Sequence, residues 1–439
     1  MQQSEFKRRR RELMRMMGPG SIAILPTAPL QIRNRDVHFP YRPDSDFFYL
    51  TGFPEPEAIC VLIPGRKQAE YILFNRERDP HKEQWDGARA GQEGACEQYG
   101  ADDSFPIGDL DDILPGLLER CERVFYAMGC NPDLDKRLSE WINRIRYESR
   151  SGLQGPVEII ALDHYLHEMR LFKSRAELKV MRQAARISSN AHRRVMQACR
   201  PGVWEYQLEV EFVSACVHQG AKAQAYPPIV GAGANACTLH YIDNQDQLPD
   251  RQMLLIDAGC ELDCYASDIT RSYPVNGRFS EAQRQLYEVV LAAQHAAIEK
   301  VKPGNHWNDP HDAAVRTITR GLIKLGILKG SLAAAIKGEK YKAFFPHRTG
   351  HWLGMDVHDV GDYKVDGAWR LLEPGMVLTI EPGIYIPAGS KGVAKKWWNI
   401  GIRIEDDVLV TREGYEVLTK DAPKSIEEIE AIMAGHDDG

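Results

Sequence analysis

The feature of this sequence that most constrains its fold is a short unit that occurs twice: an apolar run, an acid, and then a glycine. Residues 253–259 read Met-Leu-Leu-Ile-Asp-Ala-Gly, and residues 376–383 read Met-Val-Leu-Thr-Ile-Glu-Pro-Gly. Short apolar runs bounded by turn residues are typical of buried strands. An acid at the end of such a strand is costly unless it is paired or binds a cation. Asp257 and Glu381 are therefore predicted to form ion pairs or to bind metal.

Each unit is followed by a second strand candidate that carries another acid. Asp268 precedes the alternating stretch 269–273, and Glu405 lies within the apolar stretch 400–410. We therefore expect two hairpins with an acid on each arm. If the two copies pack about a pseudo-twofold axis, four carboxylates converge, and such hard oxygen donors suit two divalent cations.

The repeat extends to the helices that precede each hairpin. Residues 174–177 (Ser-Arg-Ala-Glu) and 280–283 (Ser-Glu-Ala-Gln) both have the pattern of a capping box, which marks a helix start. Each predicted helix ends at a Pro-Gly pair, at 201–202 and 303–304, and a further helix follows it. Residues 174–439 therefore predict two copies of a helix–helix–hairpin unit.

The length of 439 residues is too great for one small core and predicts at least two domains. Residues 1–172 are predicted to form an α/β domain, and residues 173–439 the repeated, acid-bearing domain. In the first domain, strand candidates occupy 21–25, 58–63 and 70–74, and helical spacing is seen near 109–120 and 134–146.

Composition argues against several classes of function. The net charge is −7 and no basic face is evident, so nucleic acid is not an expected partner. No apolar run approaches the roughly 20 residues that a membrane helix requires. The basic stretch 7–11 is not followed by the apolar segment of a secretory signal, and its arginines are expected to be mostly solvated. Nine cysteines without zinc-binding spacing fit a reducing, cytoplasmic location.

Histidines precede both acid-bearing hairpins: His240 lies before the first, and His347, His351 and His358 lie before the second. A single histidine is usually an ordinary core or surface residue. Three of them next to an acid-bearing hairpin favour a metal site. The stretch 231–236 has the glycine spacing of a dinucleotide-binding loop, but that loop requires a following helix, and residues 237–241 are predicted to be a strand.

These motifs resemble a known family. The ordered set Asp257, Asp268, His351, Glu381 and Glu405 is similar to the five metal ligands of the pita-bread metallopeptidases. Three segments, 44–53, 167–174 and 401–406, resemble the Xaa-Pro aminopeptidase (aminopeptidase P) branch. The sequence departs from that branch at Gly350, where serine is common, and over 391–399. The resemblance implies an α/β N-terminal domain and an α+β pita-bread catalytic domain with a pseudo-twofold internal repeat.

The resemblance also implies an activity: release of the N-terminal residue from peptides with proline in the second position, by means of two divalent metal ions, expected to be Mn²⁺. Asp268 and Glu405 would bridge the ions, Asp257 would complete one, and His351 and Glu381 the other. Glu381 would also accept a proton from the attacking water. His240 and His358 would hydrogen-bond the substrate carbonyl or the oxyanion that forms from it.

The expected proline pocket, again by resemblance, contains His347, Tyr385 and Arg403. The ordinary alternative for Tyr385 and Arg403 is strand packing and an ion pair. Trp85 would cover the pocket from a neighbouring subunit of a homotetramer, with the N-terminal domain serving in oligomerisation and capping of the site.

Other functions remain open at this point. Prolidase has the same ligands but cleaves only Xaa-Pro dipeptides. Methionine aminopeptidase normally lacks the long N-terminal domain. Metal-free pita-bread proteins bind peptides or act as chaperones, but they have lost ligands that this sequence retains.

Overall fold

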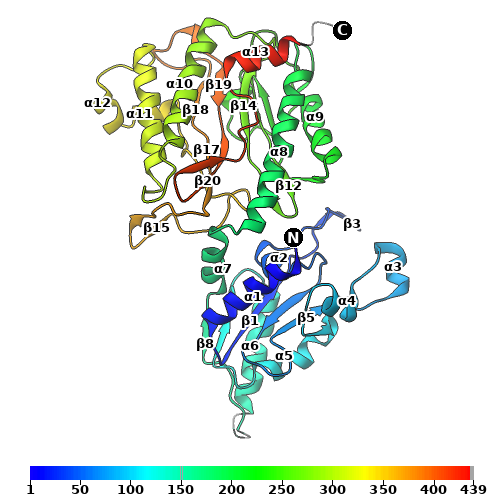
Figure 1. Cartoon of the computed structure of the whole chain (residues 1–439). Helices are drawn as coiled ribbons and strands as arrows, with labels where there is room; N and C mark the ends of the chain where they lie inside the picture. Colours follow the sequence, from blue (N-terminus) through cyan, green and yellow to red (C-terminus); the bar gives the residue numbers. More distant parts are fainter. Residues whose placement is uncertain (149, 151, 436–439) are drawn as a thin grey trace. The chain divides into compact units, whose positions relative to one another are not determined.

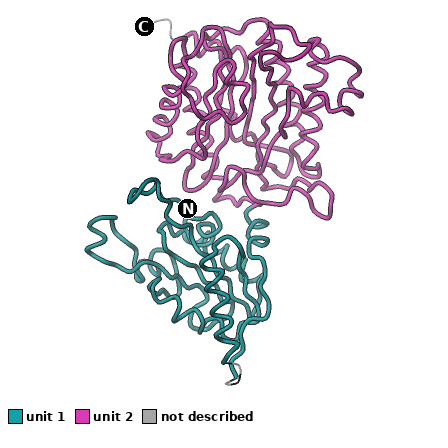
Figure 2. The backbone as a smooth tube through the Cα atoms, turned by 180° about the vertical axis from the view of Figure 1, so that it is seen from behind, with its two compact units in different colours: residues 1–170 teal, residues 171–439 magenta. Residues whose placement is uncertain are grey.

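The computed structural model describes residues 1–148, 150 and 152–435, and the chain divides into two compact units, Met1–Arg170 and Leu171–Gly439 (Figure 2). This division lies close to the boundary expected at 172/173. Within the described residues, no helix combines the length and the apolar character that a membrane span requires.

The first unit is built on a mixed six-stranded sheet with the order β6-β5-β4-β1-β7-β8 (Figure 1). Its strands are β1 (Ser21–Pro26), β4 (Ile59–Leu62), β5 (Tyr71–Asn75), β6 (Asp103–Pro106), β7 (Arg123–Phe125) and β8 (Glu158–Ile160), with a separate hairpin of β2 (Ile32–Asn34) and β3 (Val37–His38). Its helices are α1 (Gln3–Met17), α2 (Ser45–Thr51), α3 (Pro80–Asp86), α4 (Gly91–Glu97), α5 (Leu110–Leu118), α6 (Pro132–Tyr147) and α7 (Leu162–Leu171). Leucines of α5 and α6 join the β-branched residues of the sheet in one apolar core.

The prediction that the N-terminal arginines are mostly solvated is wrong for two of them. Arg9 and Arg10 are 0% and 3% exposed. Arg9 donates to the carbonyl of Tyr49, and Arg10 donates to the carbonyl of Leu50. The guanidinium of Arg10 also lies 3.9 Å from the ring centre of Tyr71. Backbone carbonyls and aromatic faces thus take the place of water around these cations.

The second unit contains the predicted helix pairs: α8 (Arg175–Ala198) with α9 (Glu205–His218), and α10 (Glu281–Ile298) with α11 (Asp309–Lys324). Both capping boxes form, so that the side chains of Ser174 and Ser280 accept from the amides three residues on. Figure 1 shows the two pairs on either side of the strands. Two shorter helices complete the unit, α12 (Leu332–Lys337) and α13 (Ile426–Ala434).

The strands of the second unit form several small sheets. The sheet β10-β11-β14 comes from the first repeat, and β17-β20-β21 and β18-β19 come from the second. Their bounds are β10 (Ile229–Ala232), β11 (Met253–Asp257), β14 (Thr270–Pro274), β17 (Val377–Ile380), β18 (Gly383–Ile386), β19 (Ile400–Arg403), β20 (Asp406–Val410) and β21 (Tyr415–Val417). The smaller strands are β9 (Ala223–Gln224), β12 (Cys260–Leu262), β13 (Tyr265–Ala266), β15 (Lys364–Val365) and β16 (Ala368–Trp369).

The four acids lie where strands end or break. Asp257 is the last residue of β11, and Asp268 lies two residues before β14 rather than on it. Glu381 directly follows β17, and Glu405 lies in the gap between β19 and β20. A strand end frees the backbone to turn, so all four side chains can point toward one place.

Two glycines near the acids are required by close packing. A Cβ at Gly259 would lie 1.7 Å from the carbonyl oxygen of Ser267, and a Cβ at Gly350 would lie 1.9 Å from that of Thr379. The departure from serine at Gly350 therefore accompanies a backbone contact that leaves no space for a side chain. The other departure, 391–399, belongs to the connection between β18 and β19, where the side chain of Trp397 is buried in the main core.

Candidate metal centre

The predicted site residues of the second unit surround one cavity of about 490 Å³. Its lining includes all the expected metal ligands, Asp257, Asp268, His351, Glu381 and Glu405, together with Tyr226, His240, His347, His358 and Arg403. Tyr385 lies behind this lining and is 4% exposed. Trp85 belongs to the first unit, where its side chain on α3 is 87% exposed.

The tightest group of potential ligands is Asp268, His351 and Glu405, whose donor atoms all lie within 4.8 Å of one another. Nε2 of His351 is 3.4 Å from Asp268 and 3.7 Å from Glu381. The other ring nitrogen of His351, Nδ1, lies 2.9 Å from the carbonyl oxygen of Trp352. A backbone contact of this kind orients a ligand imidazole, so that Nε2 faces the acids.

The electrostatics of the cavity favour a bound cation. Burial, followed by the charges of the neighbouring carboxylates, raises the pKa of Asp268 and raises that of Glu405 well above its ordinary value. Burial also raises the pKa of Glu381 to about 7. Burial acts to lower the pKa of His351, but Asp268 and Glu381 outweigh it and raise the value to about 9. Divalent cations would relieve this repulsion, and the oxygen-rich donor set suits hard metals.

Asp257 is held from two sides. Nη2 of Arg403 donates to one carboxylate oxygen at 2.6 Å, and the hydroxyl of Tyr226 donates to the other at 2.6 Å. The same hydroxyl is also within hydrogen-bonding reach of Asp268. Tyr226 was not predicted from the sequence, because a single Tyr-Pro pair in a loop carries no periodic or motif signal.

A chain of hydrogen bonds extends from the cavity into the strands. Arg403 donates through Nη1 to the hydroxyl of Tyr385 at 2.8 Å, and that hydroxyl lies 2.9 Å from Nε2 of His347. Nε of Arg403 donates to the hydroxyl of Thr270, which in turn donates to Glu405 at 2.6 Å. Burial and then the Arg403 charge lower the pKa of His347 to about 3, so this imidazole is neutral.

The remaining predicted histidines lie on the cavity wall. The ring of His358 contacts that of His351 edge-on, with centres 4.4 Å apart. Burial and then the charge of His351 lower the pKa of His358. His240 lies in a turn that follows a 3₁₀ helix, Asn235–Cys237, so the strand predicted over 237–241 is wrong. The side chain of Asn235 bonds to Glu205 and Asp246, and these contacts favour the turn over an extended strand.

Comparison with known proteins defines the class. Residues 179–412 match the model of metallopeptidase family M24, and residues 6–126 match the aminopeptidase P N-terminal domain. The chain belongs to metallopeptidase family M24 and combines the pita-bread catalytic domain with that N-terminal domain.

Particular relatives narrow the class to the aminopeptidase P branch. The chain is 44% identical to the Xaa-Pro aminopeptidase of Escherichia coli over 98% of this chain and 97% of the relative. It is 35% identical to human Xaa-Pro aminopeptidase 3, over 99% of this chain and 86% of the relative. The structure of Pseudomonas aeruginosa aminopeptidase PepP matches with a TM-score of 0.99 and 60% identity, covering 100% of this chain and 99% of that one. A variant of Escherichia coli aminopeptidase P in complex with substrate matches with a TM-score of 0.97 and 43% identity, covering 100% of both chains.

Proposed function

We propose that this protein is a metal-dependent exopeptidase that releases the N-terminal residue from peptides with proline in second position, using two divalent cations, with Mn²⁺ the preferred ion. The observation that carries the proposal is the convergence of one imidazole and four carboxylates on a single cavity, in a chain of the aminopeptidase P branch. That branch favours aminopeptidase activity over the prolidase alternative.

The proposed metal ligands have different roles according to where they lie in the cavity. Asp268 and Glu405 belong to the closest donor cluster, which supports a bridging role between two ions. Asp257, held by Arg403 and Tyr226, would complete one ion, and His351 with Glu381 would complete the other. When bound, such ions make water nucleophilic at neutral pH and polarise the scissile carbonyl.

We assign proton transfer to Glu381. Glu381 lines the same cavity as the other proposed ligands, and a carboxylate at that position can accept a proton and return it. It would take the proton of the attacking water and deliver it to the leaving nitrogen of proline. His240 and His358, on the wall of the same cavity, would hydrogen-bond the substrate carbonyl as negative charge develops on its oxygen.

Selectivity for proline follows from the walls of the cavity. The peptide bond before proline lacks an N–H, and the proline ring fixes φ. A site that suits proline therefore offers an apolar surface shaped to the ring and has no hydrogen-bond acceptor that would be left without a donor. Ile229, Leu239, Ile242 and Val357 supply apolar lining. His347 would face the ring as a neutral imidazole. Tyr385 and Arg403 would act through their hydrogen bonds to His347 and Asp257.

The proposal also covers the oligomeric state of the protein and its location in the cell. Aromatic residues are enriched at subunit interfaces, and the indole of Trp85 is 87% exposed, which supports a contact with another subunit. We therefore infer a homotetramer in which the N-terminal domain supplies contacts and Trp85 covers the pocket of a neighbour. Nine free cysteines support a cytoplasmic location.

The decisive experiment compares matched peptides on the Mn²⁺-loaded enzyme. We expect kcat/KM for Xaa-Pro-Xaa tripeptides to exceed that for Xaa-Ala-Xaa by at least ~100-fold, with Xaa-Pro dipeptides cleaved far more slowly than the proline tripeptides. Equal rates on the tripeptides would leave a general metalloaminopeptidase, and a preference for the dipeptide would restore the prolidase alternative.

A further inference from the structure

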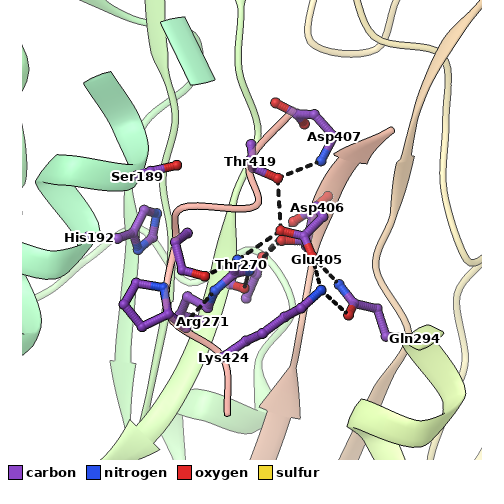
Figure 3. Close-up of polar contacts among 12 residues, drawn as sticks. Ser189, His192, Thr270, Arg271, Gln294, Glu405, Asp406, Asp407, Thr419 and Lys424 are labelled. Carbon is purple, nitrogen blue, oxygen red and sulfur yellow. Dashed lines mark hydrogen bonds and ion pairs between the residues drawn. The ribbon is translucent and has the colours of Figure 1, made fainter. Parts of the chain in front are cut away.

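Three consecutive acids, Glu405, Asp406 and Asp407, have three different surroundings. Glu405 lines the cavity. Asp406 is fully buried behind it and accepts hydrogen bonds from four side chains, those of Arg271, Gln294, Thr419 and Lys424 (Figure 3). Asp407 is 1% exposed, and its carboxylate oxygens lie 3.2 and 3.3 Å from the backbone nitrogen of Asp268, which donates to them. The run therefore connects the second hairpin to a ligand of the first.

Arg271 connects the hairpins in the other direction, from the first hairpin to a ligand of the second. It lies on β14, in the first hairpin, and is 0% exposed. Its Nη1 donates to the backbone carbonyl of Glu405 and, at 2.9 Å, to that of Thr270. Its Nη2 donates to Asp406 at 2.8 Å. A side chain of the first hairpin thus holds the backbone of a ligand in the second, while Asp407 of the second holds the backbone of a ligand in the first.

We propose that Arg271 and Asp407 are positioning residues that form a reciprocal clasp, which holds the backbones of Asp268 and Glu405 so that both carboxylates face the cavity where cations would bind. The inference rests on the proposed function, because it assigns the clasp to the metal ligands. Like charges would otherwise push the two carboxylates apart, and groups that orient ligands typically change metal affinity 10–100-fold when removed. Neither residue faces the cavity, so neither touches substrate or metal.

The chain offers a matched control in Lys424. Like Arg271, it places a cation against Asp406, at 2.6 Å, and it also donates to Gln294. Unlike Arg271, it has no hydrogen bond to the backbone of a metal ligand among the described residues. Lys424→Met and Arg271→Met therefore each remove one cation from Asp406. The second also releases the carbonyl of Glu405, together with those of Ala422 and Pro423.

The test measures Mn²⁺ affinity on the full chain after removal of metal with a chelator. Mn²⁺ is titrated into protein, and the free ion is followed by electron paramagnetic resonance, with thermal unfolding recorded in parallel. We expect Arg271→Met and Asp407→Ala each to weaken Mn²⁺ binding at least tenfold, Lys424→Met to change it less than threefold, and Asp407→Asn, which retains an acceptor oxygen, to stay within threefold of wild type.

Other outcomes overturn the clasp. Wild-type affinity in Asp407→Ala, or an equal loss in Lys424→Met, would make the network a support of the fold alone. If Arg271→Met does not fold, Arg271→Lys decides, because it replaces the two nitrogens that separately contact the Glu405 carbonyl and Asp406 with one. Unchanged affinity in that variant would also refute the clasp. A wild-type protein that binds no Mn²⁺ would instead refute the proposed function.

Discussion

The guanidinium of Arg403 donates a hydrogen bond to the carboxylate of Asp257 at 2.6 Å, which joins β19 of the second repeat to the end of β11 in the first. The remaining nitrogens of Arg403 also have partners in the protein, the hydroxyls of Tyr385 and Thr270. A side chain whose three nitrogens are all engaged in this way orients its neighbours rather than adapting to a substrate.

The first prediction concerns this arginine. Arg403→Lys retains the charge but cannot make all three contacts, so kcat/KM should fall at least tenfold, about 1.4 kcal/mol of transition-state stabilisation. Tyr385→Phe removes one contact of Arg403 and leaves its bond to Asp257, so the loss should be smaller. Steady-state kinetics on an Xaa-Pro-Xaa tripeptide measures both. A larger loss in Tyr385→Phe would mean that the phenol itself contacts substrate.

The second prediction is that Asp268→Ala abolishes activity without damaging the fold. As a bridging ligand, Asp268 would serve both cations, so kcat/KM should fall by at least ~1,000-fold, about 4 kcal/mol. The metal-free variant should melt at or above the temperature of metal-free wild type, because a buried carboxylate with a raised pKa is removed. Retention of a tenth of wild-type turnover would exclude the bridging role.

The third prediction concerns pH. The pKa of Glu381 is raised to about 7 from 4.5, so its contribution to stability is fully present below pH 4.5 and is lost as pH rises through about 7. The raised pKa values of Asp268, Glu405 and His351 act in the same direction. Metal-free protein should therefore lose stability between pH 5 and 8, with Glu381 contributing about 3 kcal/mol.

Calorimetry of wild type and Glu381→Gln across that range isolates this contribution. The variant lacks the titrating carboxyl, so the difference in melting temperature between the two proteins should grow in favour of the variant as pH rises. Parallel curves for the two proteins would show that Glu381 ionises normally.

The fourth prediction separates chemistry from metal binding. His358→Ala should lower kcat/KM by ~100-fold, about 2.7 kcal/mol, because a donor to the developing oxyanion is lost. Metal content should be unchanged, since His358 is not among the proposed ligands. His218→Ala, at the exposed end of α9, serves as the control. Loss of metal from His358→Ala would make this imidazole a ligand instead.

The fifth prediction is the metal content. After loading with Mn²⁺ and gel filtration, elemental analysis should find close to two ions per chain, and a chelator should abolish activity until Mn²⁺ is returned. Full activity in the presence of chelator, with a metal content near zero, would contradict the dinuclear site.

Local signals explain why much of the fold was predictable. Capping boxes at 174–177 and 280–283 and the apolar runs before Asp257 and Glu381 depend on neighbouring residues alone, and all form as expected. The repeat then implied convergence of the acids, because two copies of one unit pack symmetrically. The sequence pattern did not predict that the strands are interrupted at Asp268 and Glu405. Both acids continue the apolar alternation in sequence, so the pattern places them within strands.

Residues that act over long sequence distances gave no signal. The hydroxyl of Tyr226 contacts Asp257 and Asp268, which lie 31 and 42 positions away in sequence. A single tyrosine in a loop has no pattern from which such a contact could be predicted. Arg271 and Asp407 are charged residues, and charged residues are expected at the surface unless their partners are known. The same bias produced the error at Arg9, whose partners include a backbone carbonyl 40 positions away.

The reciprocal contacts between the hairpins also govern when the site can form. The amide of Asp268 and its acceptor Asp407 are separated by 139 positions, and Thr270 and Glu405 by 135. Contacts of such high sequence separation form late, because a long loop must close before they can stabilise anything. During synthesis, therefore, Asp257 and Asp268 can contact Tyr226, but Asp257 lacks Arg403 and the amide of Asp268 lacks Asp407 until almost the whole second repeat has left the ribosome. A nascent chain that stalls before residue 405 lacks Glu405 and Asp407, so the proposed metal centre cannot assemble until nearly the whole chain has been made.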